Sequence, residues 1–160
     1  MSFVSTLWIC TKKEDQIVEE EFLWLASMFT KMSEQSYGSK VFVREPNQIF
    51  MQKPVWVNFM KAGEWNPSHF HAGLISCVAY LSVPEEIEIE NVESEHSKKS
   101  NIPSAGRIQW TYGESIQFSE TYFTQVPKDK DIWFFPAELK HYVYPFKSDV
   151  ERVSISCNFK

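Results

Sequence analysis

The sequence predicts a mainly β protein, a sandwich or barrel of short strands with one α-helix near the N-terminus. Many short runs of β-branched and aromatic residues follow one another at close spacing, and Pro, Gly, Asn, Asp or Ser separates most of them. A single segment near the start shows a helical period instead. The 160 residues, 43% of them hydrophobic, match the size of one ordinary domain with a real core. We therefore expect residues 1–160 to form a single domain.

The helix is predicted over residues 12–34. Thr11 and Glu14 form a capping box at its start. Apolar residues then recur in steps of four, three, four and three, which places them on one helical face. These residues are Val18, Phe22, Leu25, Phe29 and Met32.

Strands are predicted for most of the chain after Gly38. The alternation Ile87-Glu88-Ile89-Glu90 indicates a half-exposed strand, and the polar stretch Ser94–Gly106 indicates an exposed loop. The predicted strands are Lys40–Arg44, Gln48–Met51, Val55–Met60, Leu74–Val83, Glu86–Val92, Arg107–Tyr112, Ser115–Phe118, Tyr122–Val126, Asp131–Phe135, His141–Phe146 and Arg152–Phe159.

The composition disfavours several classes of protein. The net charge is -5 and no basic stripe is present, so an extended nucleic-acid surface is not expected. The N-terminus lacks the charged region of a signal peptide, and no apolar run reaches the roughly 20 residues of a membrane span. Cys10, Cys77 and Cys157 are far apart and odd in number, which favours reduced thiols in a soluble cytoplasmic protein.

Three histidines occupy informative positions. His69 and His71 are two residues apart, so in an extended segment both side chains point to the same face and can bind one ion. His141, in a later strand-like segment, is the candidate third ligand. A pair of partly exposed polar residues is the alternative reading of His69 and His71. Eleven residues after His141 comes Arg152-Val153-Ser154. On an adjacent antiparallel strand, the Arg152 guanidinium could bind a carboxylate near the metal, with Ser154 on the same face.

Two runs of the sequence resemble those of 2-oxoglutarate/iron(II) oxygenases. The first is Trp56–Tyr80, which contains Asn-Pro-Ser-His-Phe-His. The second is Asp131–Pro136, which ends in Phe-Pro and leads to His141 and then to Arg152–Phe159. The chain is most similar to a branch found in phages and marine bacteria, which has His-x-His where most relatives have His-x-Asp.

The resemblance implies a double-stranded β-helix (jelly roll) that holds Fe(II) between its two sheets. His69, His71 and His141 would be the iron ligands. Arg152 would bind the distal carboxylate of the cosubstrate 2-oxoglutarate, with help from Ser154. The implied activity is hydroxylation of an unidentified substrate.

Further pocket residues follow from the same resemblance. Tyr80 and Asn58 are candidates for the cosubstrate pocket, with Asn158 as a weaker third. The all-imidazole ligand set departs from the common triad of two histidines and a carboxylate. Because imidazole also suits zinc, copper and nickel, the iron assignment rests on the resemblance.

Other functions remain open. A three-histidine zinc enzyme would need no Arg152 near the metal. A cupin dioxygenase matches less well, because Ile75 and Ser76 stand where its glutamate would fall and no glycine lies between Pro136 and His141. A non-catalytic jelly-roll binding module with a protein partner is the third alternative, and a homo-oligomer is compatible with the sequence.

Overall fold

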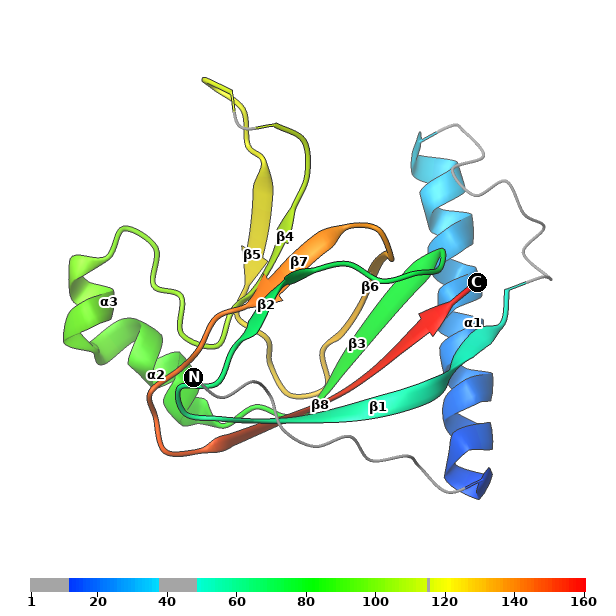
Figure 1. The fold of residues 1–160 in the computed structure, drawn as a ribbon, viewed down its shortest axis with the longest axis horizontal. Helices are drawn as coiled ribbons and strands as arrows, with labels where there is room; N and C mark the ends of the chain where they lie inside the picture. Colours follow the sequence, from blue (N-terminus) through cyan, green and yellow to red (C-terminus); the bar gives the residue numbers. More distant parts are fainter. Residues whose placement is uncertain (1–11, 38–48, 115) are drawn as a thin grey trace.

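Two four-stranded antiparallel sheets face each other and enclose a cavity (Figure 1). The computed structural model describes residues 12–37, 49–114 and 116–160. The β1 sheet contains, in spatial order, β1 (Met51–Lys61), β8 (Glu151–Phe159), β3 (Ile75–Ser82) and β6 (Ile132–Pro136). The β2 sheet contains β2 (Asn66–His69), β7 (Lys140–Val143), β4 (Ile108–Thr111) and β5 (Tyr122–Gln125). The predicted mainly β jelly roll with an N-terminal helix is confirmed.

The helix α1 (Lys12–Tyr37) covers the outer face of the β1 sheet, as Figure 1 shows. Phe22 and Phe29 pack on Phe134 of β6, with ring centroids 6.5 and 6.1 Å apart. Ala26, between them on the helix, is fully buried. Met32 is 61% exposed, so its predicted place on the buried face is wrong. The buried face instead passes through Ala26 and Thr30, and the predicted cap Thr11 lies outside the described residues. Within the described ranges, no helix is long and apolar enough to cross a bilayer.

The side chains of β8 alternate between the two faces of the sheet, which are different environments. Ile155, Cys157 and Phe159 point outward and join the apolar cluster beneath α1. Their neighbours of opposite parity point inward and line the cavity: Arg152, Ser154, Ser156 and Asn158. The inner face of this sheet is therefore polar along β8, while its outer face is apolar. A helix over the outer face removes that apolar surface from water.

The predicted strand Glu86–Val92 is a helix, α2 (Glu85–Glu93). Three acidic residues occupy its first turn, where the helix dipole stabilises them. Ile87 and Asn91, four residues apart, are its buried residues. The Asn91 amide donates to the carbonyls of Ile87 and Ala105. The alternation of Ile and Glu was misleading, because residues four apart, such as Ile87 and Asn91, lie on the same side of a strand and also on the same face of a helix.

Three further segments differ from expectation. The predicted loop Ser94–Gly106 contains α3 (Glu95–Lys99), which the Ser94 side chain caps. In the predicted strand Ser115–Phe118, Ser115 is not described and residues 116–118 form part of a turn in which Phe118 has a φ of 67°. Strand β2 was not predicted, because Asn66 and Pro67 are typical turn residues. The predicted strand Lys40–Arg44 lies outside the described residues.

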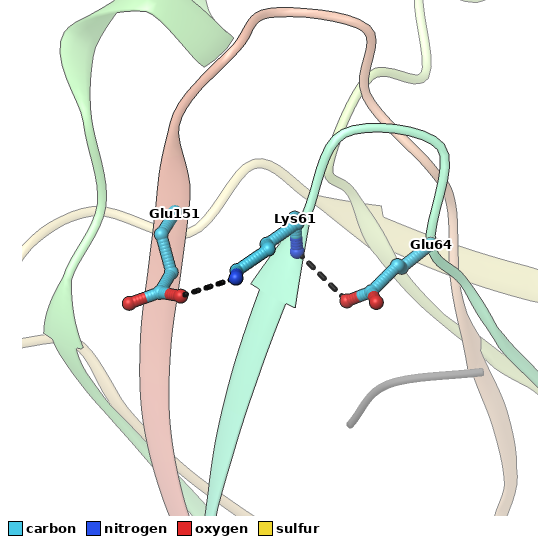
Figure 2. Close-up of polar contacts among 3 residues, drawn as sticks. All are labelled: Lys61, Glu64 and Glu151. Atoms are coloured by element: carbon cyan, nitrogen blue, oxygen red, sulfur yellow. Dashed lines mark hydrogen bonds and ion pairs between the residues drawn. The ribbon is translucent and has the colours of Figure 1, made fainter. Parts of the chain in front are cut away.

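The turn from β1 to β2 is held by Glu64, whose carboxylate accepts from the backbone N–H of Lys61 at 2.9 Å. The Lys61 ammonium lies 3.9 Å from Glu151 on the neighbouring strand β8 (Figure 2). Both charged side chains are largely exposed, so this ion pair contributes little to stability. The turn closes the end of the sheet at which β8 begins with Glu151 and Arg152.

Glu90 of α2 joins that helix to the loop between β7 and β8. Its carboxylate accepts from the backbone N–H groups of Lys147 and Ser148 and from the Ser148 hydroxyl. Burial opposes ionisation, but the hydrogen bonds from Ser148 and Lys147 outweigh it, so the pKa of Glu90 lies below its ordinary value. Ionised Glu90 therefore stabilises this loop.

Candidate metal centre

The structure brings His69, His71 and His141 together at one end of the cavity. His69 ends β2 and lies opposite His141 of β7 in the antiparallel register. His71 follows two residues later, where its backbone N–H donates to the carbonyl of Ala137 at 2.8 Å. One nitrogen of each imidazole lies within 4.8 Å of the others. The ring centroids are 4.3 to 5.1 Å apart, so the three side chains converge on one point.

Backbone carbonyls orient two of these rings. The His69 Nδ1 lies 2.7 Å from the Pro67 carbonyl oxygen, and the His141 Nδ1 lies 2.9 Å from that of Leu139. Because a carbonyl oxygen can only accept, each Nδ1 donates its proton there, and Nε2 is the ring nitrogen left to bind a metal. This arrangement is typical of metal-binding histidines, whose second nitrogen is held by a hydrogen bond.

The same environment favours the neutral forms of His71 and His141. Burial lowers the pKa of His141 to about 4, outweighing the hydrogen bond to Leu139, and His69 and His71 lower it further. Burial, followed by the nearby His69, also lowers the pKa of His71. Neutral imidazoles are the form that binds metals. The donor set fits a divalent transition metal such as iron, zinc, copper or nickel.

Arg152 lies in the same cavity as a buried cation without an anion. It is only 4% exposed. One guanidinium nitrogen donates to the Gly106 carbonyl at 2.8 Å, another lies 2.9 Å from the Met60 sulfur, and Nε has no partner. Its carbon lies 5.4 Å from the centre of the Tyr80 ring. No salt bridge to Arg152 occurs among the described residues. Because a buried charge is costly unless paired, this site calls for an anionic ligand.

Arg152 reaches the cavity from the opposite sheet, not from a strand adjacent to β7. Strand β7, with His141, belongs to the β2 sheet, whereas β8 belongs to the β1 sheet. The expectation that Arg152 lies on a strand adjacent to that of His141 is therefore wrong. The side chains share one cavity across the sandwich.

The other expected pocket residues also line this cavity. Ser154 is 3% exposed and lies in register between Asn58 of β1 and Tyr80 of β3. The Asn58 amide donates to the Ser156 hydroxyl at 3.3 Å, and the Ser76 hydroxyl donates to Asn158 at 2.7 Å. Among the described residues, no carboxylate lines the cavity.

Sequence reasoning missed the residues around the guanidinium. Gly106 has a φ of +64°, and a Cβ there would lie 2.7 Å from the Ile87 side chain. Glycine at this position thus allows the backbone to lie close to α2, with the Gly106 carbonyl oxygen within hydrogen-bond distance of Arg152. Met60 pairs with Arg152 in register, which the strand alternation alone could not reveal.

Two facing antiparallel sheets, with a histidine cluster and a buried arginine between them, define a jelly-roll protein with a candidate metal centre. Residues 54–158 match the sequence profile of the family described as "Putative 2OG-Fe(II) oxygenase". Because this match covers more than half of the sequence, the chain belongs to that 2OG-Fe(II) oxygenase family. Comparison with proteins of curated function gives no match.

One solved structure shows a similar fold. An oxidoreductase of the 2OG-Fe(II) oxygenase family from Burkholderia pseudomallei aligns with a TM-score of 0.52 and 12% identity, over 82% of this chain and 50% of that one. This chain thus spans half the length of that protein. A cupin domain from Bordetella pertussis Tohama I aligns with a TM-score of 0.40 and 14% identity, over 70% of this chain and 91% of its own.

Proposed function

We propose that this protein is an Fe(II)- and 2-oxoglutarate-dependent oxygenase that hydroxylates an unidentified substrate. The observation that carries the proposal is the cation of Arg152, which has no anionic partner among the described residues and shares its cavity with three converging imidazoles. A metal centre and an anion site in one enclosed space suit a ligand that chelates metal at one end and carries a carboxylate at the other.

His69 and His141 would hold the iron through Nε2, since Nδ1 of each donates to a backbone carbonyl, and His71 would supply the third imidazole nitrogen. Bound Fe(II) supplies dioxygen activation, coupled to oxidative decarboxylation of 2-oxoglutarate to succinate and CO2. The hydrogen bonds to Pro67 and Leu139 fix the orientation of two rings before any ion binds. Such preorganisation lowers the cost of assembling the site.

Arg152 would bind the distal carboxylate of the cosubstrate through its planar fork of N–H groups. Two of its N–H groups lack a strong acceptor and would bind the carboxylate. One is Nε, which has no partner among the described residues, and the other is the nitrogen that contacts the Met60 sulfur, a weak acceptor. The carbonyl of Gly106 holds the guanidinium in place. Ser154 would add a hydroxyl donor, and Tyr80 and Asn58 would form adjacent walls.

The charge of the ligand set favours a dianionic cosubstrate. Three imidazoles leave the full charge of a divalent ion uncompensated, and the cavity lining adds the cation of Arg152. Together these are three positive charges, and no carboxylate occurs among the described residues of the lining. The two negative charges of 2-oxoglutarate would reduce the total to one, whereas a monoanion would leave two buried positive charges uncompensated.

The test is anaerobic addition of Fe(II) and then 2-oxoglutarate to the purified protein. We expect a visible metal-to-ligand charge-transfer band, because the keto acid chelates iron. Succinate, which lacks the keto group, is the matched ligand and should give no band. Folded, iron-loaded protein that shows no band with 2-oxoglutarate contradicts the proposal.

A zinc enzyme is the second candidate, because an all-imidazole set with two oriented rings also suits zinc. It would use a zinc-bound water as nucleophile and would leave Arg152 without a role. Equal binding of Zn(II) in wild-type protein and in Arg152→Met, with no response to 2-oxoglutarate, would favour it.

A further inference from the structure

The metal cavity is closed at one end of β8 and open toward the other. Four inward-facing residues of this strand line the cavity: Arg152, Ser154, Ser156 and Asn158. Arg152 and Ser154 are buried, at 4% and 3% exposure, whereas Ser156 and Asn158 are only half-buried. A molecule from solvent therefore reaches the cavity from the side of Asn158, which we call the mouth.

The histidine cluster lies in the half of the cavity near the mouth. Trp56 pairs in register with Ser156, and the Trp56 ring centroid lies 5.6 Å from that of His71. Ser156 is four residues along the strand from Arg152, a distance of about 13 Å. The cosubstrate of the proposed function, bound between Arg152 and the metal, would therefore occupy the closed half.

Asn158 lies one step further toward the mouth. It pairs in register with Ser76, which in turn pairs with Phe135 of β6. The Phe135 ring centroid lies 4.8 Å from that of His141. Asn158 is thus level with the candidate metal centre, and along the strand it is about 20 Å from Arg152.

The Asn158 amide has its oxygen occupied and its N–H groups free. The Ser76 hydroxyl donates to Oδ1 at 2.7 Å, which leaves the two N–H groups of Nδ2 without an acceptor among the described residues. Unlike Nε of Arg152, this nitrogen is not one of the enclosed polar atoms, so a molecule in the cavity can reach it. The side chain therefore presents hydrogen-bond donors, and no acceptor, to a ligand at the mouth.

The charge of the lining favours an uncharged ligand group at this point. Apart from the three imidazoles, Arg152 is the one charged residue among the described residues of the lining, and it lies at the closed end. A carboxylate would be drawn to that cation and to the metal. A neutral carbonyl oxygen is an acceptor that a neutral amide N–H group can bind without them.

We propose that Asn158 is a specificity-determining residue, whose Nδ2 donates to a carbonyl oxygen of an uncharged substrate group, such as an amide, at the mouth of the cavity. Naming this ligand the substrate rests on the proposed oxygenase function; binding of a carbonyl compound at Asn158 does not.

The test uses N,N-dimethylacetamide, a carbonyl compound without N–H groups, as the probe. The protein is ¹⁵N-labelled and loaded with Zn(II), which is diamagnetic and supports no turnover, and the side-chain amide signal of Asn158 is followed. We expect this signal to shift, with a dissociation constant on the order of 10 mM for so small a probe. tert-Butanol, of similar size but without a carbonyl group, should bind more weakly. An unmoved Asn158 signal, or equal binding of tert-butanol, overturns the proposal.

Variants locate the site. Asn158→Leu keeps a similar volume but removes both donors, and we expect it to weaken binding of the probe about fivefold, the loss of one hydrogen bond. Asn101→Leu, at an exposed position, is the matched control and should leave binding unchanged. If Asn158→Leu does not fold, Asn158→Ala replaces it. Unchanged affinity in the folded variant of Asn158 overturns the proposal.

The charge-transfer titration with Fe(II) and 2-oxoglutarate separates substrate from cosubstrate. Asn158→Leu should bind 2-oxoglutarate as tightly as the wild type does, because the cosubstrate lies in the closed half. A loss of tenfold or more would assign Asn158 to the cosubstrate and overturn the proposal. A shift of the Asn158 signal without any charge-transfer band in the wild type would support the carbonyl site and contradict the oxygenase.

Discussion

Replacing Arg152 with methionine should stabilise the ligand-free protein while it removes cosubstrate binding. Methionine has a similar length and shape but no charge. In the wild type the guanidinium is buried, has no anionic partner among the described residues, and has one nitrogen without any hydrogen bond. An arginine that served only to stabilise the fold would be expected to have an anionic partner and a full set of hydrogen bonds. The substitution therefore tests whether Arg152 is present for a ligand.

The expected magnitude follows from two opposing effects. Replacing a buried ionic group with a well-packed apolar one stabilises by about 1–4 kcal/mol. Against this, the Gly106 carbonyl loses its 2.8 Å hydrogen bond, which costs about 1 kcal/mol. We expect Arg152→Met to raise the free energy of unfolding by up to about 3 kcal/mol. Loss of a buried charged contact should weaken 2-oxoglutarate binding by at least about 30-fold.

Urea unfolding under anaerobic conditions with Fe(II), with and without 2-oxoglutarate, measures both effects. Cosubstrate at a hundred times its Kd should stabilise the wild type by about 2.7 kcal/mol and the variant hardly at all. Lys61→Met is the control, because that cation is exposed and paired with Glu151. If Arg152→Met lowers the stability of the ligand-free protein by more than about 2 kcal/mol, the arginine is structural and the reasoning fails.

Three other predictions follow from the same structure. Gly106→Ala should lower the free energy of unfolding by about 1–3 kcal/mol and weaken 2-oxoglutarate binding, because the new methyl group meets α2 at a strained φ. Gly113→Ala, with a similar φ but open space around it, should show only the backbone strain, and equal losses in urea melts would contradict this account. Glu90→Gln should cost about 1 kcal/mol at neutral pH, discounted for partial exposure. Because the folded pKa of Glu90 lies below its ordinary value of 4.5, the stabilisation is present above pH 4.5 and is lost as the pH falls through the folded pKa. The gap between wild type and Glu90→Gln should therefore close in acid, and a gap independent of pH in thermal melts would refute it. His71→Ala should lose iron on dialysis, whereas His71→Asp should retain it, since a carboxylate can replace one imidazole; metal analysis of the dialysed proteins decides between these outcomes.

Local patterns in the sequence were sufficient to predict several residues of the candidate site. His69 and His71 share a face because they are two residues apart in extended chain, and the same period places Arg152 and Ser154 together. The structure brings these side chains into one cavity. The resemblance to the oxygenase family, carried by these runs, agrees with the match over residues 54–158.

The parts that depend on distant pairing could not be read from the sequence. The opposition of His69 to His141 is set by the register of β2 and β7, and β2 itself has turn-like residues. The contact between Gly106 and Arg152 joins positions 46 residues apart in the sequence. The segment Glu86–Val92 shows that apolar–polar alternation alone does not distinguish a strand from a helix, because either can place Ile87 on a buried side.

The alternation of side chains along β8 has a consequence for the evolution of this protein. Odd-numbered positions from Ile155 onward pack in the apolar cluster beneath α1, while the even-numbered positions from Arg152 to Asn158 line the cavity. Selection for stability and selection for chemistry therefore act on interleaved but separate sets of residues. A new cosubstrate or substrate preference could arise through the even set without loss of foldedness, and a saturation screen should show two tolerance profiles that alternate residue by residue along one strand.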